Sequence, residues 1–287
     1  GGTVWKWMAL HDGVLYAMIG GEEVETKLRP GDAEGYGGWP WGMWPGYDYK
    51  DPSKAWAFGK HLLAIDAKTG EVLWNHEESH YLDGRALTMS GGRIYGYSPD
   101  RYLTCIDAKS GKPLWKSEHK ETLEAIGANG RAQGYIRGFA STCYMKSDDD
   151  FLYFAGPQRE QLTVVSAADG KLAWTFGDGN FQLILRDDDL FAFGKQGGKS
   201  YKLKPATGEV LAEFPGRRAC TRATGSVDSL FCRARGGTIR FNPSNNKIEH
   251  IAPMRPACHD GVIISDGHLY WGPWICACKL SLFGHIG

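Results

Sequence analysis

The segment LLAIDAKTGEVLW, residues 62–74, decides the fold, because related segments recur along the chain. YLTCIDAKSGKPLW begins at Tyr102 and QLTVVSAADGKLAW at Gln161, while SYKLKPATGEVLAEF from Ser200 and TIRFNPSNNKIEHI from Thr238 are weaker copies. Each copy has an alternating apolar segment, a polar turn that closes on Gly or Asn, and a second short strand-like segment. This pattern is typical of a β-hairpin.

A second motif adds two more strands to each repeat. It is a polar turn followed by an apolar–aromatic pair, as in HDGVLYA from residue 11 and SGGRIYG from residue 90. Its aromatic position recurs, about 40 residues apart, at Tyr153, Phe191, Phe231 and Tyr270. Together the two motifs predict four strands per repeat. In the fourth repeat we expect these strands at residues 181–185, 190–193, 200–203 and 209–214.

Repeated four-stranded antiparallel units of about 40 residues are the signature of a β-propeller. We therefore predict an all-β fold, a single propeller domain over residues 1–287 in which about six blades are visible. A β-sandwich array and an open solenoid are the alternatives. One helical window, roughly residues 121–128, interrupts the strands. The segment TVWKW from Thr3 either completes a six-bladed ring or belongs to a seven- or eight-bladed chain, and we favour the longer chain.

The hairpins that carry tryptophan resemble those of a known family. The residues that carry the resemblance in the first copy are Ala64, Asp66, Thr69, Gly70 and Trp74. Their spacing is similar to the tryptophan-docking motif of pyrroloquinoline-quinone-like, or quinoprotein-type, propellers, and the resemblance covers nearly the whole chain. We predict a structural role for Trp74, Trp115 and Trp174. Each ring is expected to lie on the neighbouring blade and to bury roughly 150–250 Å².

Charge and hydropathy exclude several classes of partner. The 33 basic and 33 acidic residues balance to a formal net charge of zero, and no block of like charge stands out. A nucleic-acid or anionic-membrane partner therefore has no electrostatic footprint here. No apolar run approaches the ~20 residues that span a bilayer. The first residue, Gly1, suggests a processed or truncated chain, which is compatible with a removed signal peptide.

The long insertions fall on one side of the predicted propeller. Loops between the second and third strands of a blade open on the same face as the connections between blades, and the insertions at residues 21–57 and 119–138 are of these two kinds. Loops on a rigid scaffold are common sites of function. We predict an aromatic binding face on this side, formed by Tyr36, Trp39, Trp41, Trp44, Tyr47, Tyr49, Trp271 and Trp274.

Three uses of this aromatic face are open. Tyr, Trp and Met are enriched at the cores of protein interfaces, which indicates a protein partner. Stacking aromatics in a concave site suit a flat or sugar-like ligand. The rings can also simply pack onto the top of the propeller and fix a loop rich in Gly and Pro. We predict a non-catalytic scaffold that engages a protein partner or a larger assembly.

The seven cysteines contain no CxxC or CxxCH pattern, which argues against a zinc ribbon and an attached haem. Hairpin register places Cys258 near Cys276, so we predict a disulfide there, with Cys278 as a competing partner. Free thiols, or a metal site of Cys258, His259, Cys276 and Cys278, are the alternatives. A disulfide indicates an oxidising compartment. The segments PACHDG and PWICAC also resemble those of secreted family members, and we expect a periplasmic or extracellular protein.

The family resemblance also raises a competing function, a quinone- or metal-dependent oxidoreductase. Enzymes of this kind hold pyrroloquinoline quinone (PQQ) with Ca²⁺ over the central channel, beside an adjacent-cysteine disulfide and a catalytic aspartate. This sequence has no Cys-Cys pair, and neither the calcium ligands nor the aspartate can be matched. We therefore predict no cofactor and no catalytic residue.

Two further groups of polar residues have ordinary explanations. We expect loop charges at His80, Asp83, Arg131, Arg137, His259 and Asp260. The two DDD segments, residues 148–150 and 187–189, occupy positions where a tight turn is expected, and Asp is favoured in turns.

Overall fold

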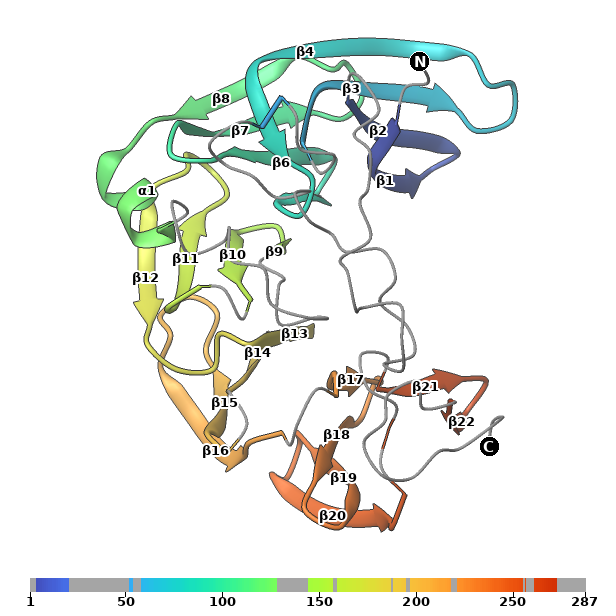
Figure 1. The fold of residues 1–287 in the computed structure, drawn as a ribbon, viewed down its shortest axis with the longest axis vertical. Helices are drawn as coiled ribbons and strands as arrows, with labels where there is room; N and C mark the ends of the chain where they lie inside the picture. Colours follow the sequence, from blue (N-terminus) through green and yellow to red (C-terminus); the bar gives the residue numbers. More distant parts are fainter. Residues whose placement is uncertain are drawn as a thin grey trace, which may run out of the picture.

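A computed structural model gives the fold of the protein. It describes residues 4–20, 52–53, 58–127, 144–156, 159–186, 188–194, 197–217, 221–254, 256 and 261–272. These residues form consecutive antiparallel sheets, five with four strands and one with two. In Figure 1 the sheets follow the chain, from blue to red, around an arc. The fold is an all-β propeller, as predicted, and we number the sheets blade 1 to blade 6 in chain order.

The first three blades each use their strands in chain order. Blade 1 consists of β1 (Val4–His11), β2 (Val14–Gly20), β3 (Phe58–Asp66) and β4 (Val72–Asp83). Blade 2 consists of β5 (Leu87–Ser90), β6 (Arg93–Ser98), β7 (Tyr102–Asp107) and β8 (Pro113–Ser117). Blade 3 consists of β9 (Tyr144–Ser147), β10 (Phe151–Ala155), β11 (Leu162–Ser166) and β12 (Leu172–Phe176).

The remaining blades continue the same order. Blade 4 consists of β13 (Gln182–Arg186), β14 (Asp189–Phe193), β15 (Lys199–Leu203) and β16 (Val210–Pro215). Blade 5 consists of β17 (Thr224–Gly225), β18 (Leu230–Ala234), β19 (Gly237–Asn242) and β20 (Lys247–Ala252). The two described strands of blade 6 are β21 (Val262–Ser265) and β22 (His268–Trp271). Blades 1 and 6 lie at the two ends of the arc, and no described sheet lies between them (Figure 1).

The described part of the chain contains one helix, α1 (Lys120–Ile126), close to the predicted window. It ends where Gly127 adopts a left-handed conformation, with φ of 58°, and donates its N–H to the Leu123 carbonyl. The side chain of Thr163 donates to the Ala125 carbonyl at 2.8 Å, which ties the helix to blade 3. The helix therefore covers part of the outer edge of the arc (Figure 1).

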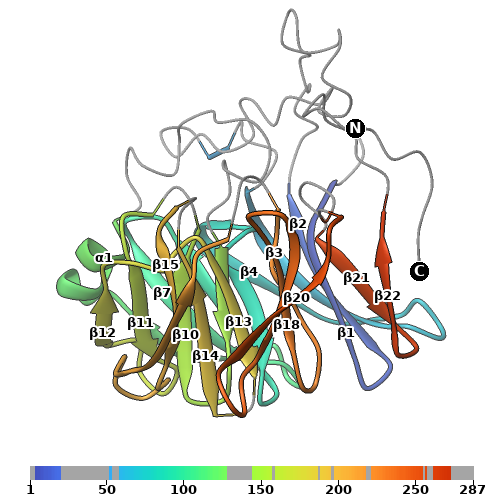
Figure 2. The same cartoon turned by 90° about the horizontal axis from the view of Figure 1, so that it is seen from below.

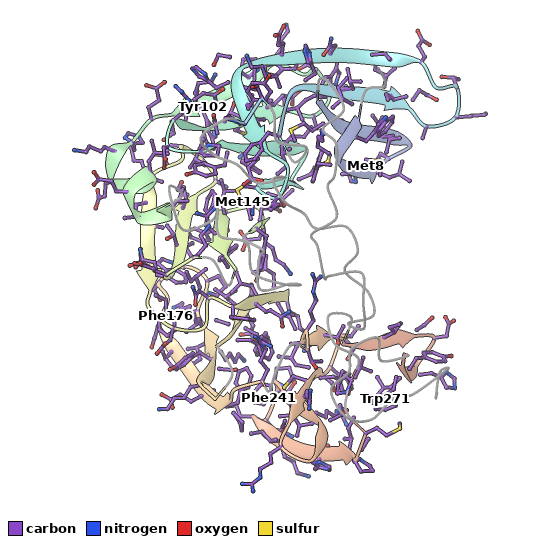
Figure 3. All side chains as sticks on the ribbon, in the orientation of Figure 1. Met8, Tyr102, Met145, Phe176, Phe241 and Trp271 are labelled. Carbon is purple, nitrogen blue, oxygen red and sulfur yellow. The ribbon has the colours of Figure 1, made fainter. Side chains whose placement is uncertain are left out.

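The core lies between blades. The apolar cluster between blades 1 and 2 includes Met18 and Leu62 from one sheet and Ile94 and Ile106 from the other, and all four are almost completely buried. Each later pair of neighbouring blades shares a cluster of the same kind. Figure 3 shows side chains in the space between successive sheets, among them the labelled cluster members Met145 and Phe241. Each blade is therefore stabilised mainly by the blade on either side of it.

The tight hairpin turns gather on one side of the arc (Figure 2). In the turn between β9 and β10, the Asp148 carboxylate accepts the backbone N–H groups of Asp150 and Phe151, at 2.9 and 2.7 Å. This first DDD segment is thus a turn, as predicted, whereas Asp187 of the second lies outside the described residues.

Candidate functional site

Among the described residues, a group of hydrogen-bonded polar side chains around the buried Glu78 lies where blade 1 meets blade 2. It begins with an irregularity in blade 1. Between the pairs His61–Glu77 and Gly59–Leu82, β3 contributes a single residue while β4 contributes four. Such a bulge bends the strand and redirects its side chains. Here it accompanies the burial of Glu78, which is only 3% exposed and reaches blade 2.

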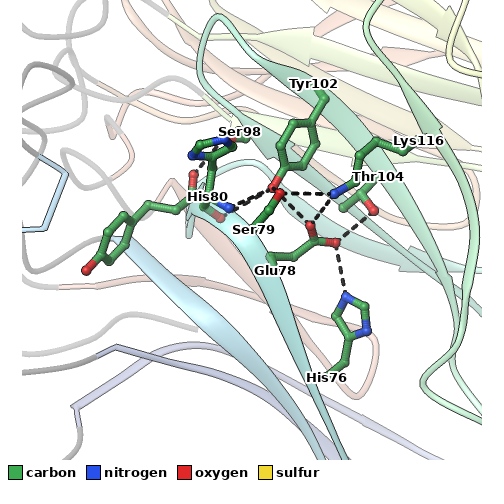
Figure 4. Close-up of polar contacts among 9 residues, drawn as sticks. His76, Glu78, Ser79, His80, Ser98, Tyr102, Thr104 and Lys116 are labelled. Carbon is green, nitrogen blue, oxygen red and sulfur yellow. Dashed lines mark hydrogen bonds and ion pairs between the residues drawn. The ribbon is translucent and has the colours of Figure 1, made fainter.

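The Glu78 carboxylate accepts hydrogen bonds from two strands of blade 2 (Figure 4). Tyr102 and Thr104 on β7 each donate a hydroxyl at 2.9 Å. Lys116 on β8 donates its Nζ at 2.9 Å, and this ammonium group also lies 4.0 Å from the centre of the Tyr102 ring. His76, on the same strand as Glu78, donates its Nε2 at 3.1 Å. We call these five residues the carboxylate clamp.

The clamp is arranged to hold a charge rather than to move a proton. Burial alone raises the pKa of Glu78, but the hydrogen bonds from His76, Lys116, Thr104 and Tyr102 outweigh it and lower the pKa to about 2. Burial alone lowers the pKa of Lys116, but its contacts with Glu78 outweigh burial and raise it. A general acid or base works best with a pKa near the operating pH. Glu78 stays ionised at neutral pH, so the clamp joins two blades electrostatically.

Two of the polar residues that we predicted as loop charges lie on β4, the strand that also carries Glu78. His80 donates its backbone N–H to the Tyr102 hydroxyl at 3.0 Å. Asp83 is fully buried at the end of β4, and Arg85 donates to its two carboxylate oxygens from Nε at 3.0 Å and Nη2 at 2.7 Å. The prediction for Asp83 is therefore wrong, because the residue is a buried ion-pair partner. The other members of that set lie outside the described residues.

A cleft of about 640 Å³ lies beside α1 at the rim of blade 2. Its walls are mostly charged and come from Asp100, Arg101, Glu118, Lys120, Leu123, Glu124 and Gly127. Lys120 and Glu124 form an ion pair at 3.6 Å across one helical turn. Both signs of charge are mixed here, so the cleft suits a polar surface segment better than an ion. Among the described residues, no three His, Cys, Asp or Glu side chains are placed to hold a metal ion.

The three tryptophans of the repeated hairpins lie against the next blade. Their indole Nε1 groups donate to backbone carbonyls, Trp74 to Ala108 at 2.9 Å, Trp115 to Ala167 at 3.2 Å and Trp174 to Pro205 at 2.9 Å. Each ring also covers a turn glycine. A Cβ atom built on those glycines would approach the tryptophan ring to 2.6 Å at Gly111, 2.9 Å at Gly170 and 2.6 Å at Gly208. We call each pair of carbonyl and glycine a tryptophan socket.

Trp271 is the one member of the predicted aromatic face that the structure describes. It is 8% exposed, packs with Phe231 and Val262, and donates its Nε1 to the Thr238 hydroxyl at 2.9 Å. In this position it contributes to the contact between blades 5 and 6. The other predicted members, Tyr36, Trp39, Trp41, Trp44, Tyr47, Tyr49 and Trp274, lie outside the described residues.

The predicted disulfide and metal candidates Cys258, His259, Cys276 and Cys278 also lie outside the described residues. Two other cysteines, Cys105 and Cys232, are buried free thiols. Burial raises the pKa of both thiols to about 12, so neither is a reactive thiolate at neutral pH. In the described part of the chain, no helix has the length and apolar content needed to cross a membrane.

Comparison with known proteins places these features in a family. The family model described as "Outer membrane protein assembly factor BamB" matches residues 59–238, more than half of the chain. No curated protein is similar enough to count as a relative.

Among solved structures, the chain is similar to a computationally designed protein, Ika8, with 11% identity, a TM-score of 0.55, and coverage of 93% of this chain and 67% of that chain. BamB from Moraxella catarrhalis gives 14% identity and a TM-score of 0.49, over 79% and 70% of the two chains. A quinohemoprotein alcohol dehydrogenase from Pseudomonas putida HK5 gives 12% identity and a TM-score of 0.46. The match covers 86% of this chain and 42% of that chain. These likenesses concern the fold alone, and the last two are too distant to bear on function. The family match, over repeats that form the blades described above, shows that the chain belongs to the PQQ-like propeller family described as outer membrane protein assembly factor BamB.

Proposed function

We propose that the chain is a non-catalytic propeller scaffold that binds a protein partner within a larger assembly, in the periplasm or outside the cell. The observation that carries this proposal is the family match over residues 59–238, whose description names an assembly factor for outer membrane proteins. The role we assign is of that kind: to hold a partner protein in place while an assembly forms.

The way the blades are joined supports a rigid platform. The carboxylate clamp uses Glu78 between blades 1 and 2, and the sockets hold Trp74, Trp115 and Trp174 between successive blades. In both cases, buried polar groups are used to fix one blade on the next. Recognition on such a scaffold falls to its loops.

We place the partner site on the loop between β2 and β3, which contains Trp39, Trp41 and Trp44. β2 ends at Gly20 and β3 begins at Phe58. The end of β2 and the start of β3 lie on the side of the arc opposite the tight hairpin turns (Figure 2). The choice is supported by the enrichment of Tyr, Trp and Met at the cores of protein interfaces.

Site-specific photo-crosslinking tests this proposal. A photoreactive amino acid replaces Trp41 in the full chain, and a matched variant carries it at Lys68, which is exposed in the turn between β3 and β4. After irradiation in the cell envelope of the source organism, we expect one defined protein adduct from position 41 and none from position 68. Identical adducts from both positions, or adducts from position 68 alone, would contradict the proposed face.

Native mass spectrometry with an absorption spectrum tests the non-catalytic part of the proposal. For protein purified from its source, we expect the mass of the bare polypeptide, lowered by two hydrogens for each disulfide among Cys258, Cys276 and Cys278. A mass that falls on denaturation, together with quinone-like absorbance or a bound metal, would instead support a PQQ- or metal-dependent oxidoreductase.

A further inference from the structure

Among the described residues, the strands on the inner side of the arc carry basic side chains and no acidic ones. They are the first strands of their blades, and Figure 1 shows β9, β13 and β17 on this side. Within the described β1, β5, β9, β13, β17 and β21, the Lys and Arg residues are Lys6, Lys146 and Arg186, and no Asp or Glu occurs. The whole chain has a formal net charge of zero, so positive charge is concentrated on this inner edge.

Two side chains of β9 reach the inner edge of blade 4. Leu183 on β13 donates its backbone N–H to the Tyr144 hydroxyl at 2.8 Å, and its carbonyl accepts the Nζ of Lys146 at 2.8 Å. Among the described strands, β13 pairs with β14 alone. Backbone groups of successive residues in a strand point to opposite edges, and those of Leu183 are used on the edge away from β14. The hydroxyl of Tyr144 and the ammonium group of Lys146 are therefore held side by side at the free edge of β13.

Arg222 brings a second cation to the same place. It lies two residues before β17, and the next residue, Ala223, donates its backbone N–H to the side-chain carbonyl of Gln182 on β13 at 2.8 Å. Burial lowers the pKa of Lys146, and the charge of Arg222 lowers it further. Burial raises the pKa of Tyr144, and Arg222 is among the groups that oppose this rise. We call Tyr144, Lys146 and Arg222 the cationic cluster.

The cationic cluster has no counter-ion among the described residues. Neither Lys146 nor Arg222 forms an ion pair with them, although Lys146 is half-buried. Lys202 on β15 is also half-buried, but it is paired with Asp189 at 2.8 Å. The Tyr144 hydroxyl accepts the backbone hydrogen bond on β13, which leaves its own hydrogen available for donation. A half-buried charge that is unpaired and lies near a like charge is unfavourable, so an anion bound here would stabilise the protein.

The cluster is accessible from one side of the arc. Arg222 is exposed, and Tyr144 and Leu183 lie at or next to the starts of β9 and β13. Both strands run from the cluster towards the tight hairpin turns, so the cluster lies near the opposite side of the arc (Figure 2). A ligand that approaches from that side meets the guanidinium group of Arg222 first and the half-buried ammonium group of Lys146 behind it.

We infer that the cationic cluster is a binding site for a carboxylate group. Lys146 and Tyr144 would donate to one carboxylate oxygen, and the guanidinium fork of Arg222 to the other. These donors suit the two oxygens of a carboxylate, whereas a phosphate or sulfate would keep oxygens without a donor. The carboxylate belongs either to an acidic polypeptide segment or to a free organic acid, and calorimetry separates these two sources. The site uses no residue of the aromatic loop, so it does not depend on the proposed partner.

Isothermal titration calorimetry of the intact chain at constant ionic strength tests the site. The probes are succinate and an amidated tetraglutamate peptide, and sulfate and a tetraglutamine peptide are their controls. We expect saturable binding of at least one carboxylate probe and of neither control. Binding of succinate would assign the site to a free organic acid, and binding of the peptide alone would assign it to an acidic segment. Lys146→Met should weaken binding at least about tenfold, whereas the matched control Lys202→Met should leave it unchanged.

The stability of the two lysine variants without a ligand separates a binding role from a structural one. Lys146→Met removes an unpaired charge, so its thermal midpoint should be at least as high as that of the native chain. Lys202→Met leaves Asp189 without its partner, so its midpoint should fall. A fall for Lys146→Met as large as that for Lys202→Met would show that Lys146 serves the fold through its contact with Leu183 and would count against the site.

Three further results would overturn the inference. One is the absence of saturable binding for both carboxylate probes. Another is binding of sulfate as tight as that of the carboxylate probes, which would make the cluster a general anion site. The third is unchanged affinity in Arg222→Gln. This variant also guards against misfolding, because Arg222 is exposed and its substitution should leave the fold intact.

Discussion

Two faces of neighbouring blades have nearly the same sequence pattern and opposite surroundings. One is the face of blade 2 that contacts blade 1, which we call the covered face and which includes Ile94 and Ile106. The other is the face of blade 1 that is turned away from blade 2, which we call the open face and which consists of Met8, Leu10, Leu15, Ile65 and Val72. Ile106 of the IDAKSG turn segment is fully buried, whereas Ile65 of the IDAKTG segment is only half-buried. The difference arises from the neighbouring sheet, which is present for Ile106 and is not found among the described residues for Ile65. A repeat sequence thus specifies a receiving surface, and only the neighbouring blade decides whether that surface is buried.

The two faces also differ in their polar residues. At the positions where blade 2 has Tyr102 and Thr104, blade 1 has His61 and Leu63. The hydroxyl donors that hold the Glu78 carboxylate are therefore missing from the open face.

The largest expected effect comes from breaking the clamp of the covered face. Glu78→Ala should lower the free energy of unfolding by about 3 kcal/mol, because it leaves buried hydroxyl groups of Tyr102 and Thr104 without their acceptor. Glu77→Ala, at the exposed neighbouring position, is the matched control and should change it by less than about 0.5 kcal/mol. Urea denaturation followed by circular dichroism measures both. Equal effects of the two substitutions would contradict the clamp.

Acid should weaken the same contact. The pKa of Glu78 is about 2 in the folded protein and 4.5 when unperturbed. Because the folded-state value is the lower one, the stabilisation is complete above about pH 4.5 and is lost as the pH falls towards 2. It amounts to about 3 kcal/mol. The measurement is the unfolding midpoint between pH 6 and pH 3 for the native chain and for Glu78→Gln. The native chain should lose more stability than the variant, and parallel losses would rule out this role.

Removal of a docked tryptophan should cost more than removal of an exposed one. The Nε1 of Trp115 donates to the Ala167 carbonyl at 3.2 Å, and the centre of its ring lies 6.1 Å from the centre of the Tyr95 ring. Trp115→Ala should therefore lower the free energy of unfolding by about 2–3 kcal/mol. Trp5 is 44% exposed on β1, and Trp5→Ala should cost less than about 1 kcal/mol. Thermal unfolding of the two variants makes the comparison. A larger loss of stability for Trp5→Ala than for Trp115→Ala would show that the exposed end of the arc is better packed than the contacts between blades.

The smallest expected effect compares two glycines. Gly111→Ala and Gly70→Ala both place a Cβ atom on a residue in the left-handed conformation, which should lower the free energy of unfolding by about 1 kcal/mol. Only Gly111→Ala also displaces the Trp74 ring, which adds about 1–2 kcal/mol. The difference between the two denaturation midpoints therefore isolates the contact of the ring with its socket. If the variants are equally stable, that contact contributes little.

The strands were predictable from sequence because alternation and turn glycines are local signals. In blade 4 every predicted strand end lies within one residue of the observed one. The carboxylate clamp was not predictable. Its partners in blade 2 lie 24 to 38 residues beyond Glu78, and the bulge in β4 breaks the alternation that would have shown the side chain turned inward. Burial of Asp83 depends likewise on Arg85 closing over it, and no motif marks that pair.

The candidate binding residues were chosen by composition, and composition does not distinguish an exposed ring from a packed one. Trp271 illustrates the limit, since it lies in an aromatic segment but packs between blades 5 and 6. The loop aromatics Trp39, Trp41 and Trp44 stay predictions. The open face was missed for a related reason. Its sequence is that of an ordinary buried blade surface.

The most direct measurement is the rate of methionine oxidation in the intact chain. Met8 belongs to the open face and is 60% exposed, while Met18 on the adjacent strand faces blade 2 and is fully buried. With dilute hydrogen peroxide and peptide mass spectrometry, Met8 should form its sulfoxide at least about tenfold faster than Met18. Equally slow oxidation of both residues in the unmodified chain would show that blade 1 is already covered, and would contradict the account.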